Sequence, residues 1–278
     1  MRPRFQPQPL LLLRGACIAL LAGLGAHGVF AGCSRPIIVP AAPTGFNVIV
    51  DGDKVSGVLP DWLNALGRRI GCSFEFPAVP RARADQMVLD AASADILLPA
   101  SQNSERDAKA VFVHLYSPMP VLVSHGSKAG EAPRDTVALK KSGWRAAMVR
   151  RYSFGAEYDA LARDLDAEGR IDAVNDLATI ERMLRAGRVE FTILPATLMH
   201  AALLDGKPID NAAEFRYQEL TGLVASPAGA YLSARALPAK DLELLRTALS
   251  QGARDGSLKR AFEAYYPPNV LRNDRFLR

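Results

Sequence analysis

Two successive series of short apolar stretches and amphipathic segments run through this 278-residue chain. The apolar stretches have the length of buried strands, and the amphipathic segments have the apolar spacing of helices with one buried face. Strands that alternate with helices predict an α/β architecture with parallel sheets. A loop-like stretch rich in charges, His125–Asp135, separates the two series.

The expected elements follow from this pattern and from the positions of Pro and Gly. The expected strands are Ile37–Val39, Ser73–Phe76, Ile96–Leu98, Val111–Leu115, Val121–Val123, Ala146–Val149, Ile171–Val174, Val189–Leu194, Phe215–Leu220 and Ala228–Ser233. The expected helices are Pro60–Ile70, Pro80–Ala92, one from Ser104, Ser153–Asp164, Leu177–Ala186, Pro195–Leu204, one from Pro238, and Leu258–Tyr266.

One stretch combines a strand end, small polar side chains and a cation. The apolar run Ile96–Leu98 ends at a proline, and Ser101 and Asn103 follow it. Ser104 is the expected N-cap of a helix whose first turn holds Arg106. Hydroxyl groups, a helix N-terminus and a guanidinium together favour an anion receptor. The alternative is that Arg106 is a solvated surface residue or pairs with an acidic neighbour.

The first 31 residues have the composition of a signal peptide. They carry three arginines and no acidic residue, contain two apolar runs, and end in Val29-Phe30-Ala31, which suits a cleavage site. We therefore expect an exported, periplasmic protein that starts near Gly32. A lipoprotein signal ending at Cys33 is the alternative. Without this segment the chain has 34 − 3 = 31 basic and 29 acidic residues, so its charge gives no support to nucleic-acid binding.

Cys33 and Cys72 are the two cysteines outside that segment. Each precedes an expected strand, and neighbouring parallel strands would bring both to one edge of a sheet. In an oxidising compartment this arrangement favours a disulfide. The alternative is two unrelated small residues. Two cysteines without a nearby histidine predict no metal site.

Several motifs, in this order and spacing, resemble the periplasmic solute-binding proteins of family 3, the polar amino-acid type that serves ABC transporters. They span most of the chain after residue 31. The motifs are Cys33-Ser-Arg-Pro-Ile-Ile-Val, Gly57-Val-Leu-Pro-Asp61, Gly71-Cys-Ser-Phe-Glu-Phe, Val79-Pro-Arg-Ala-Arg83, Asp95-Ile-Leu-Leu-Pro-Ala-Ser101 with Ser104-Glu-Arg106 and Phe112, and Ala186-Gly-Arg-Val-Glu-Phe191.

The resemblance implies a two-lobed periplasmic-binding-protein fold of type II, with a largely parallel sheet in each lobe and the ligand in the cleft between them. Lobe one would be residues 33–120 plus 228–270, lobe two residues 121–227, and residues 271–278 a C-terminal tail. The crossing segments would be Tyr116–Leu122 and Gly229–Leu232. Closure would be a hinge motion.

The resemblance also implies site residues. Arg106 matches the arginine that clamps the ligand carboxylate, with Ser101 and Asn103 beside it. Arg83, Arg151 and Ser153 are further candidates, and the two arginines would suit a more anionic ligand. The family's ammonium-binding acid in lobe two would fall at Leu194 or Pro195, which carry no charge.

The leading functional hypothesis is a monomeric solute-binding protein that delivers a small carboxylate to an ABC permease. The alternatives are a dehydratase-like enzyme on the same fold and a binding module that reports to a sensor. No catalytic residue, metal or cofactor is expected, because none of the histidines His114, His125 and His200 lies in a nucleophile or metal motif.

Overall fold

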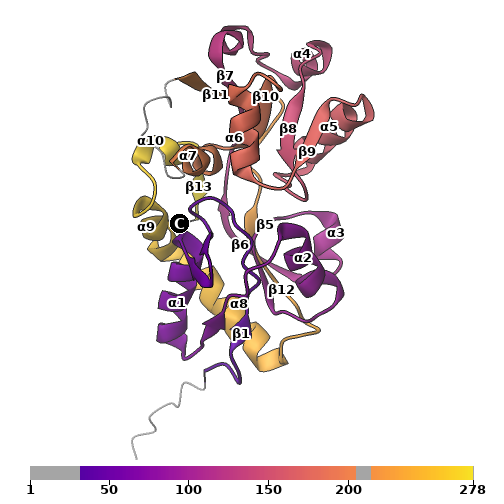
Figure 1. Ribbon diagram of the computed structural model, residues 1–278. Coiled ribbons are helices and arrows are strands. Elements are labelled where there is room, and N and C mark those ends of the chain that lie inside the picture. Colours follow the sequence, from indigo (N-terminus) through magenta and orange to yellow (C-terminus); the bar gives the residue numbers. More distant parts are fainter. Residues whose placement is uncertain (1–31, 205–213, 278) are drawn as a thin grey trace, which may run out of the picture. The chain divides into compact units, whose positions relative to one another are not determined.

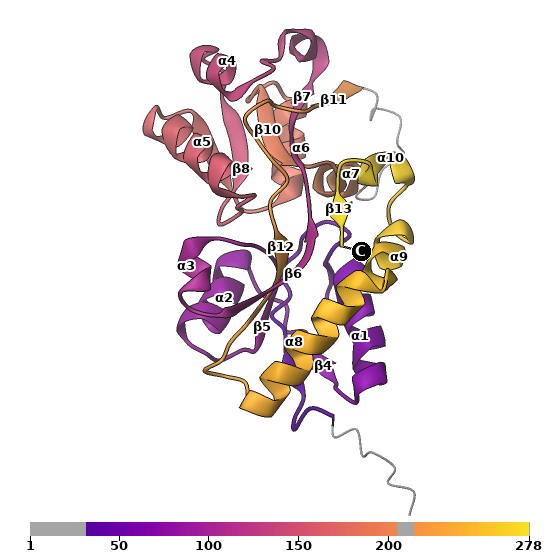
Figure 2. The same ribbon diagram turned by 180° about the vertical axis from the view of Figure 1, so that it is seen from behind.

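Two β-sheets with helices packed against them organise the chain (Figures 1 and 2). The structure is a computed structural model, and it describes residues 32–204 and 214–277. The predicted signal peptide, residues 1–31, lies outside the described residues. Within the described residues, no helix combines the length and the apolar character that crossing a membrane requires.

The sheet of the first lobe has the strand order β13-β6-β12-β5, and β1 and β4 form a separate parallel pair. The strands of this lobe are β1 (Ile37–Ile38), β2 (Ile49–Asp51), β3 (Lys54–Ser56), β4 (Phe74–Glu75), β5 (Ile96–Ser101), β6 (Val111–Ser117), β12 (Ala228–Leu232) and β13 (Arg275–Phe276). Its helices are α1 (Val58–Ile70), α2 (Arg81–Asp85), the π-helical turn η1 (Gln86–Asp90), α3 (Ser104–Asp107), α8 (Ala239–Arg254), α9 (Ser257–Glu263) and α10 (Pro268–Leu271).

The second lobe has a five-stranded sheet of order β11-β7-β10-β8-β9. Its strands are β7 (Pro120–His125), β8 (Ala146–Val149), β9 (Ile171–Val174), β10 (Phe191–Pro195) and β11 (Phe215–Gln218). Its helices are the 3-10 helix η2 (Gly126–Glu131), α4 (Thr136–Lys141), α5 (Ala156–Ala167), α6 (Leu177–Arg185) and α7 (Ala196–Leu204). One hydrophobic core, built from this sheet and its helices, holds the lobe together.

Strand β5 shows how the apolar sequence pattern builds the core. Alternate side chains of a strand point to opposite faces of its sheet. Ile96 and Leu98 accordingly join the core that contains α1, α8 and α9, whereas Leu97 joins the smaller core under α2 and η1. Helices therefore cover both faces of this sheet (Figures 1 and 2), which explains why the strand is apolar on both sides.

The sequence of helix α1 accounts for its buried face and for where it ends. Leu59, Leu63 and Leu66 are buried on one face, at the spacing of an amphipathic helix. The helix ends at Gly71, which takes the left-handed conformation with φ of 73°. A glycine adopts this conformation without the steric cost that a Cβ atom would add.

The sheets are mixed, which differs from the largely parallel sheets that we predicted. In the second lobe β10–β8 and β8–β9 are parallel, but β7 is antiparallel to both of its partners. In the first lobe β12 runs antiparallel between β5 and β6. The reason is that β12 returns from the second lobe and enters the sheet against the direction of the earlier strands.

Two local predictions concern the chain path. The predicted crossing segment Gly229–Leu232 lies within β12, which pairs with β5 and β6. Pro99 does not end its strand, since β5 continues to Ser101. Proline is tolerated there because β5 is the edge strand of its sheet and its pairing with β12 is irregular beside Pro99.

The ends of the described chain are held in the first lobe. A disulfide joins Cys33 to Cys72, with Cα atoms 4.9 Å apart. Strands β1 and β4, which follow these cysteines, pair in parallel as the sequence predicted. A sulfur in this bridge cannot also carry a thioether-linked lipid. At the other end, the predicted tail contains β13, which pairs with β6. The exact lobe boundaries remain predictions.

Candidate functional site

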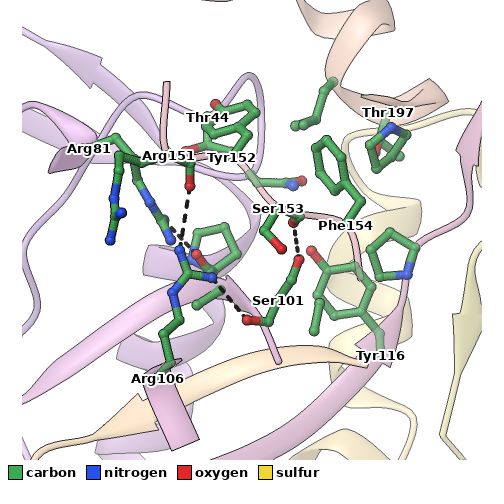
Figure 3. A pocket seen from close by; sticks show the side chains of 17 residues that line it. Thr44, Arg81, Ser101, Arg106, Tyr116, Arg151, Tyr152, Ser153, Phe154 and Thr197 are labelled. Atoms are coloured by element: carbon green, nitrogen blue, oxygen red, sulfur yellow. Dashed lines mark hydrogen bonds between the residues drawn. The ribbon is translucent and has the colours of Figure 1, made fainter. Parts of the chain in front are cut away.

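Arg106 lines a cavity between the lobes (Figure 3). It is only 3% exposed. Its Nη1 donates to the backbone oxygen of Ser101 at 2.9 Å, and its Nη2 lies 3.1 Å from the Asp85 carboxylate. Among the described residues, its Nε has no hydrogen-bond partner. The solvated-surface alternative is therefore wrong, and the pairing partner is Asp85 rather than an acidic neighbour in sequence.

The backbone places this guanidinium through a short capped helix. Strand β5 ends at Ser101, and α3 begins three residues later. The side chain of Asn103 accepts a hydrogen bond from the backbone N–H of Arg106 at 2.9 Å. Asn103 is thus the N-cap of α3, one residue before the predicted cap Ser104. It fixes the turn that carries Arg106 and does not line the cavity.

Arg81, at the start of α2, provides a second guanidinium. Its Nε lies 3.1 Å from Asp85 Oδ1, and its Nη1 donates to the backbone oxygen of Pro99 at 2.6 Å. Burial lowers the pKa of Arg81, while the charge of Asp85 opposes that shift and the charge of Arg106 adds to it. An arginine nevertheless stays protonated in proteins, so Arg81 contributes a full positive charge.

Arg151 brings a third guanidinium from the second lobe. It follows β8 and has a φ of 67°, in the left-handed region that non-glycine residues seldom adopt. Its Nη2 lies 3.5 Å from Asp85 and 3.6 Å from the exposed Glu105, both of which belong to the first lobe. Its backbone oxygen accepts from Arg106 Nη2 at 3.4 Å. Three guanidiniums therefore surround one buried carboxylate, that of Asp85.

Ser101 and Ser153 connect the lobes across the cavity. The hydroxyl of Ser101 donates to the backbone oxygen of Ser153 (Figure 3). The hydroxyl of Ser153 donates to Asp159 at 2.8 Å, and burial raises the pKa of that carboxyl. Hydroxyl groups from both lobes therefore lie beside the arginines.

The rest of the cavity wall is largely apolar. The cavity has a volume of about 50 Å³. Tyr152 is half-buried there, and burial raises the pKa of its hydroxyl. The remaining lining residues are Thr44, Asn47, Pro99, Ala100, Tyr116, Pro118, Phe154, Pro195, Thr197, Leu198 and Ala228.

Four of the six predicted ligand-binding residues meet at this cavity: Ser101, Arg106, Arg151 and Ser153. Arg83 does not line it, because its exposed side chain points away and donates to Gln86 at 2.7 Å. Arg81, two residues earlier, lines the cavity instead. Successive helical residues are 100° apart, so these two arginines lie on nearly opposite sides of α2.

The cavity lining contains no acidic side chain among the described residues. Pro195, one of the two positions where the resemblance would place the ammonium-binding acid, is part of the wall. In the part of the chain that the structure describes, no cluster of three or more His, Cys, Asp or Glu side chains could hold a metal ion. The arrangement is suited to holding an anion.

Solved structures with the same architecture are numerous. A histidine kinase sensor domain with similarity to periplasmic binding proteins matches at TM-score 0.66 and 14% identity, over 84% of this chain and 96% of that one. The chain has the periplasmic-binding-protein fold. The arginine-, lysine-, histidine-binding protein ArtJ from Geobacillus stearothermophilus matches at TM-score 0.68 and 13% identity, over 86% of this chain and 99% of that chain.

A third structure with this fold, the substrate-binding protein of an amino acid ABC transporter, matches at TM-score 0.64 and 13% identity, over 84% of this chain and 99% of that chain. No family model matches the sequence. No curated protein matches it either. At these identities the likeness shows the fold alone.

Proposed function

We propose that this chain is a periplasmic solute-binding protein that captures a small carboxylate-bearing solute and delivers it to an ABC transporter. The observation that carries the proposal is the meeting of Arg81, Arg106 and Arg151 at one cavity beside the buried carboxylate of Asp85. Arg81 and Arg106 are both largely buried and share the one negative charge of Asp85, whereas Arg151 is 46% exposed and also lies 3.6 Å from Glu105. A buried cation without its full counter-charge is costly, and a bound anion would reduce this cost.

The origin of the site residues supports a link between binding and lobe closure. Arg106 and Ser101 come from the first lobe, and Arg151 and Ser153 from the second. Closing the lobes would bring Arg151 beside the carboxylates of Asp85 and Glu105 and also beside the other two guanidiniums, and an anion in the cavity would offset the repulsion among the three cations. A carboxylate in the cavity would therefore favour the closed arrangement, as expected for a protein that signals its loaded state to a membrane partner.

The transport role draws support from fold neighbours such as the substrate-binding protein of an amino acid ABC transporter. A ligand-sensing module is the second candidate, because a histidine kinase sensor domain shares the fold over most of both chains. Adjacent genes for a permease and an ATPase would favour transport. An adjacent gene for a kinase would favour sensing.

A thermal-shift screen of small carboxylates, amino acids and inorganic anions tests the binding function. A ligand at about one hundred times its Kd stabilises the folded state by about 2.7 kcal/mol. For a domain of this size that corresponds to a rise in Tm of about 5–10 °C. We expect at least one small carboxylate to produce such a shift. If no ligand of this panel raised Tm at millimolar concentration, the result would contradict the proposal.

A further inference from the structure

We propose that the ligand is a short organic acid with an apolar body and without an ammonium group, such as a 2-oxo acid. This inference rests on the proposed function and narrows the class of solute that the cavity accepts. Three features of the cavity carry it: the charge around Arg106, the apolar wall opposite, and the small volume.

The charge argument starts with Asp85. Its Oδ1 contacts Arg81, and its Oδ2 contacts Arg106 and Arg151. Asp85 does not line the cavity, and arginines stand beside both of its oxygens, although Oδ1 accepts no hydrogen bond. The ammonium group of a ligand in the cavity would therefore meet the guanidiniums rather than this carboxylate. The three guanidiniums together carry more N–H donors than one carboxylate can accept. A second acceptor beside the carboxylate, such as a 2-oxo or 2-hydroxy oxygen, could accept from donors that the carboxylate leaves over.

Among the described residues, the other acids near the arginines do not line the cavity either. Glu105 lies on the exposed side of Arg151 and is 57% exposed, and it does not line the cavity. Asp159 lies behind Ser153 and accepts the hydroxyl of that residue. An α-amino acid with its carboxylate at Arg106 would thus hold its ammonium group close to three cations and without a carboxylate partner. Such like-charge juxtaposition opposes binding strongly.

The opposite wall suits a hydrocarbon. Phe154, Pro195 and Leu198 come from the second lobe, and Pro118 lies in the link between β6 and β7. Figure 3 shows Phe154 on the far side of Ser101 and Ser153 from the arginines. The cavity is thus basic at one end and largely apolar at the other, where Thr197 also lies. A ligand that matches both ends carries its charge at one end and carbon atoms at the other.

The volume limits the length of that carbon chain. A buried water needs roughly 10–15 Å³ of such a cavity, so about 50 Å³ holds on the order of four waters. Pyruvate and 2-oxobutyrate are of suitable size. Ligands with long side chains exceed it in the closed arrangement.

Matched pairs of ligands test the inference by calorimetry on the purified protein. Pyruvate is compared with L-alanine, and 2-oxobutyrate with L-2-aminobutyrate, because each pair differs only in the oxo or ammonium group. We expect the 2-oxo acids to bind on the order of a hundredfold more tightly. Equal or tighter binding of the amino acids would overturn the inference and leave the proposed function standing. Binding of succinate or inorganic phosphate, with neither 2-oxo acid, would likewise overturn it.

Two arginine variants on α2 complete the test. Arg81→Gln removes a cavity cation, and Arg83→Gln removes an exposed cation on the other side of the same helix. We expect Arg81→Gln to lose at least tenfold in affinity for 2-oxobutyrate, and Arg83→Gln to bind like the wild type. Equal affinities of the two variants would remove Arg81 from the site and contradict the charge argument. Absence of binding by every ligand of the screen would instead contradict the proposed function.

Discussion

Arg106 Nη2 lies 3.1 Å from Asp85 Oδ2, and each of the two side chains is only 4% exposed. Asp85 is thus the carboxylate that allows three guanidiniums to share one cavity. Removal of one partner of a buried charge pair typically costs about 3–5 kcal/mol, because the other charge stays buried without compensation. We expect Asp85→Asn to lower the free energy of unfolding by about that amount, as measured by urea denaturation.

Asp90→Asn is the matched control for this change. Asp90 lies five residues further on, is 56% exposed, and pairs with Lys109 at the surface. Exposed ion pairs contribute about 0–1 kcal/mol, so this variant should remain close to the wild type. If the free energy of unfolding falls by the same small amount in both variants, Asp85 does not compensate the charges of the arginines.

The cap of α3 gives a second prediction. Asn103 accepts the backbone N–H of Arg106, and loss of an N-cap side chain costs about 1 kcal/mol. We expect Asn103→Ala to lower stability by that amount and to weaken ligand binding less than a change at Arg106 itself. Ser104→Ala should change neither quantity, because Ser104 is exposed and does not cap the helix. If Ser104→Ala lowered the stability and Asn103→Ala did not, Ser104 would be the N-cap as first predicted.

A pH dependence follows from Asp274, beside the link between the lobes. Its Oδ1 accepts the backbone N–H of Met119 at 3.2 Å, its Oδ2 is buried, and burial raises its pKa from 3.8 to about 7. Between these two values the folded protein keeps a proton that the unfolded chain has lost. Stability should therefore fall as pH rises from about 4 to 7, by at most about 4 kcal/mol, and level off above pH 7.

Urea denaturation of the wild type and of Asp274→Asn at several pH values isolates this effect. The amide keeps an oxygen acceptor for Met119 and does not titrate. As the pH rises from about 4 to 7, the free energy of unfolding of the wild type should fall relative to that of Asp274→Asn. A constant difference would show that Asp274 ionises at its ordinary pKa.

The disulfide gives a fourth prediction. Cys33 and Cys72 are 39 positions apart, and a bridge over such a loop stabilises by about 3–4 kcal/mol in the chain-entropy model. The Cys33→Ser, Cys72→Ser double variant should be less stable than the wild type by that amount. Thiol titration of the denatured, unreduced protein should detect no free thiol from these residues. Two free thiols would contradict the bridge.

The sequence was sufficient for the parts of the site that depend on local order. The apolar run of β5, the polar residues after it and Arg106 are contiguous, so their placement follows from one strand and one turn. The disulfide was predictable for a similar reason, since both cysteines precede strands of one β-α-β unit. The sequence did not separate Ser101 from Asn103, since both were predicted to bind ligand and only Ser101 lines the cavity.

The sequence did not predict features that depend on which side of a helix faces the cavity, or on a strand that enters a sheet from the other lobe. Arg81 and Arg83 differ by two positions on one short helix, and the apolar pattern there does not fix which side faces the cavity. The mixed sheet direction arises because β12 enters from the other lobe, which no local pattern encodes. Phe154 and Tyr152 follow β8, and only the approach of the two lobes brings them opposite Arg106.

Calorimetric titration of Arg106 variants tests the central claim most directly. The titrant is the small carboxylate that raises Tm most in the screen. The control is Arg83→Ala, which removes a positive charge that does not line the cavity. Wild type and Arg83→Ala should bind equally, Arg106→Lys more weakly because it loses the planar fork, and Arg106→Ala at least about thirtyfold more weakly. Unchanged affinity in a folded Arg106→Ala would contradict the account, because Arg106 would then not hold the ligand.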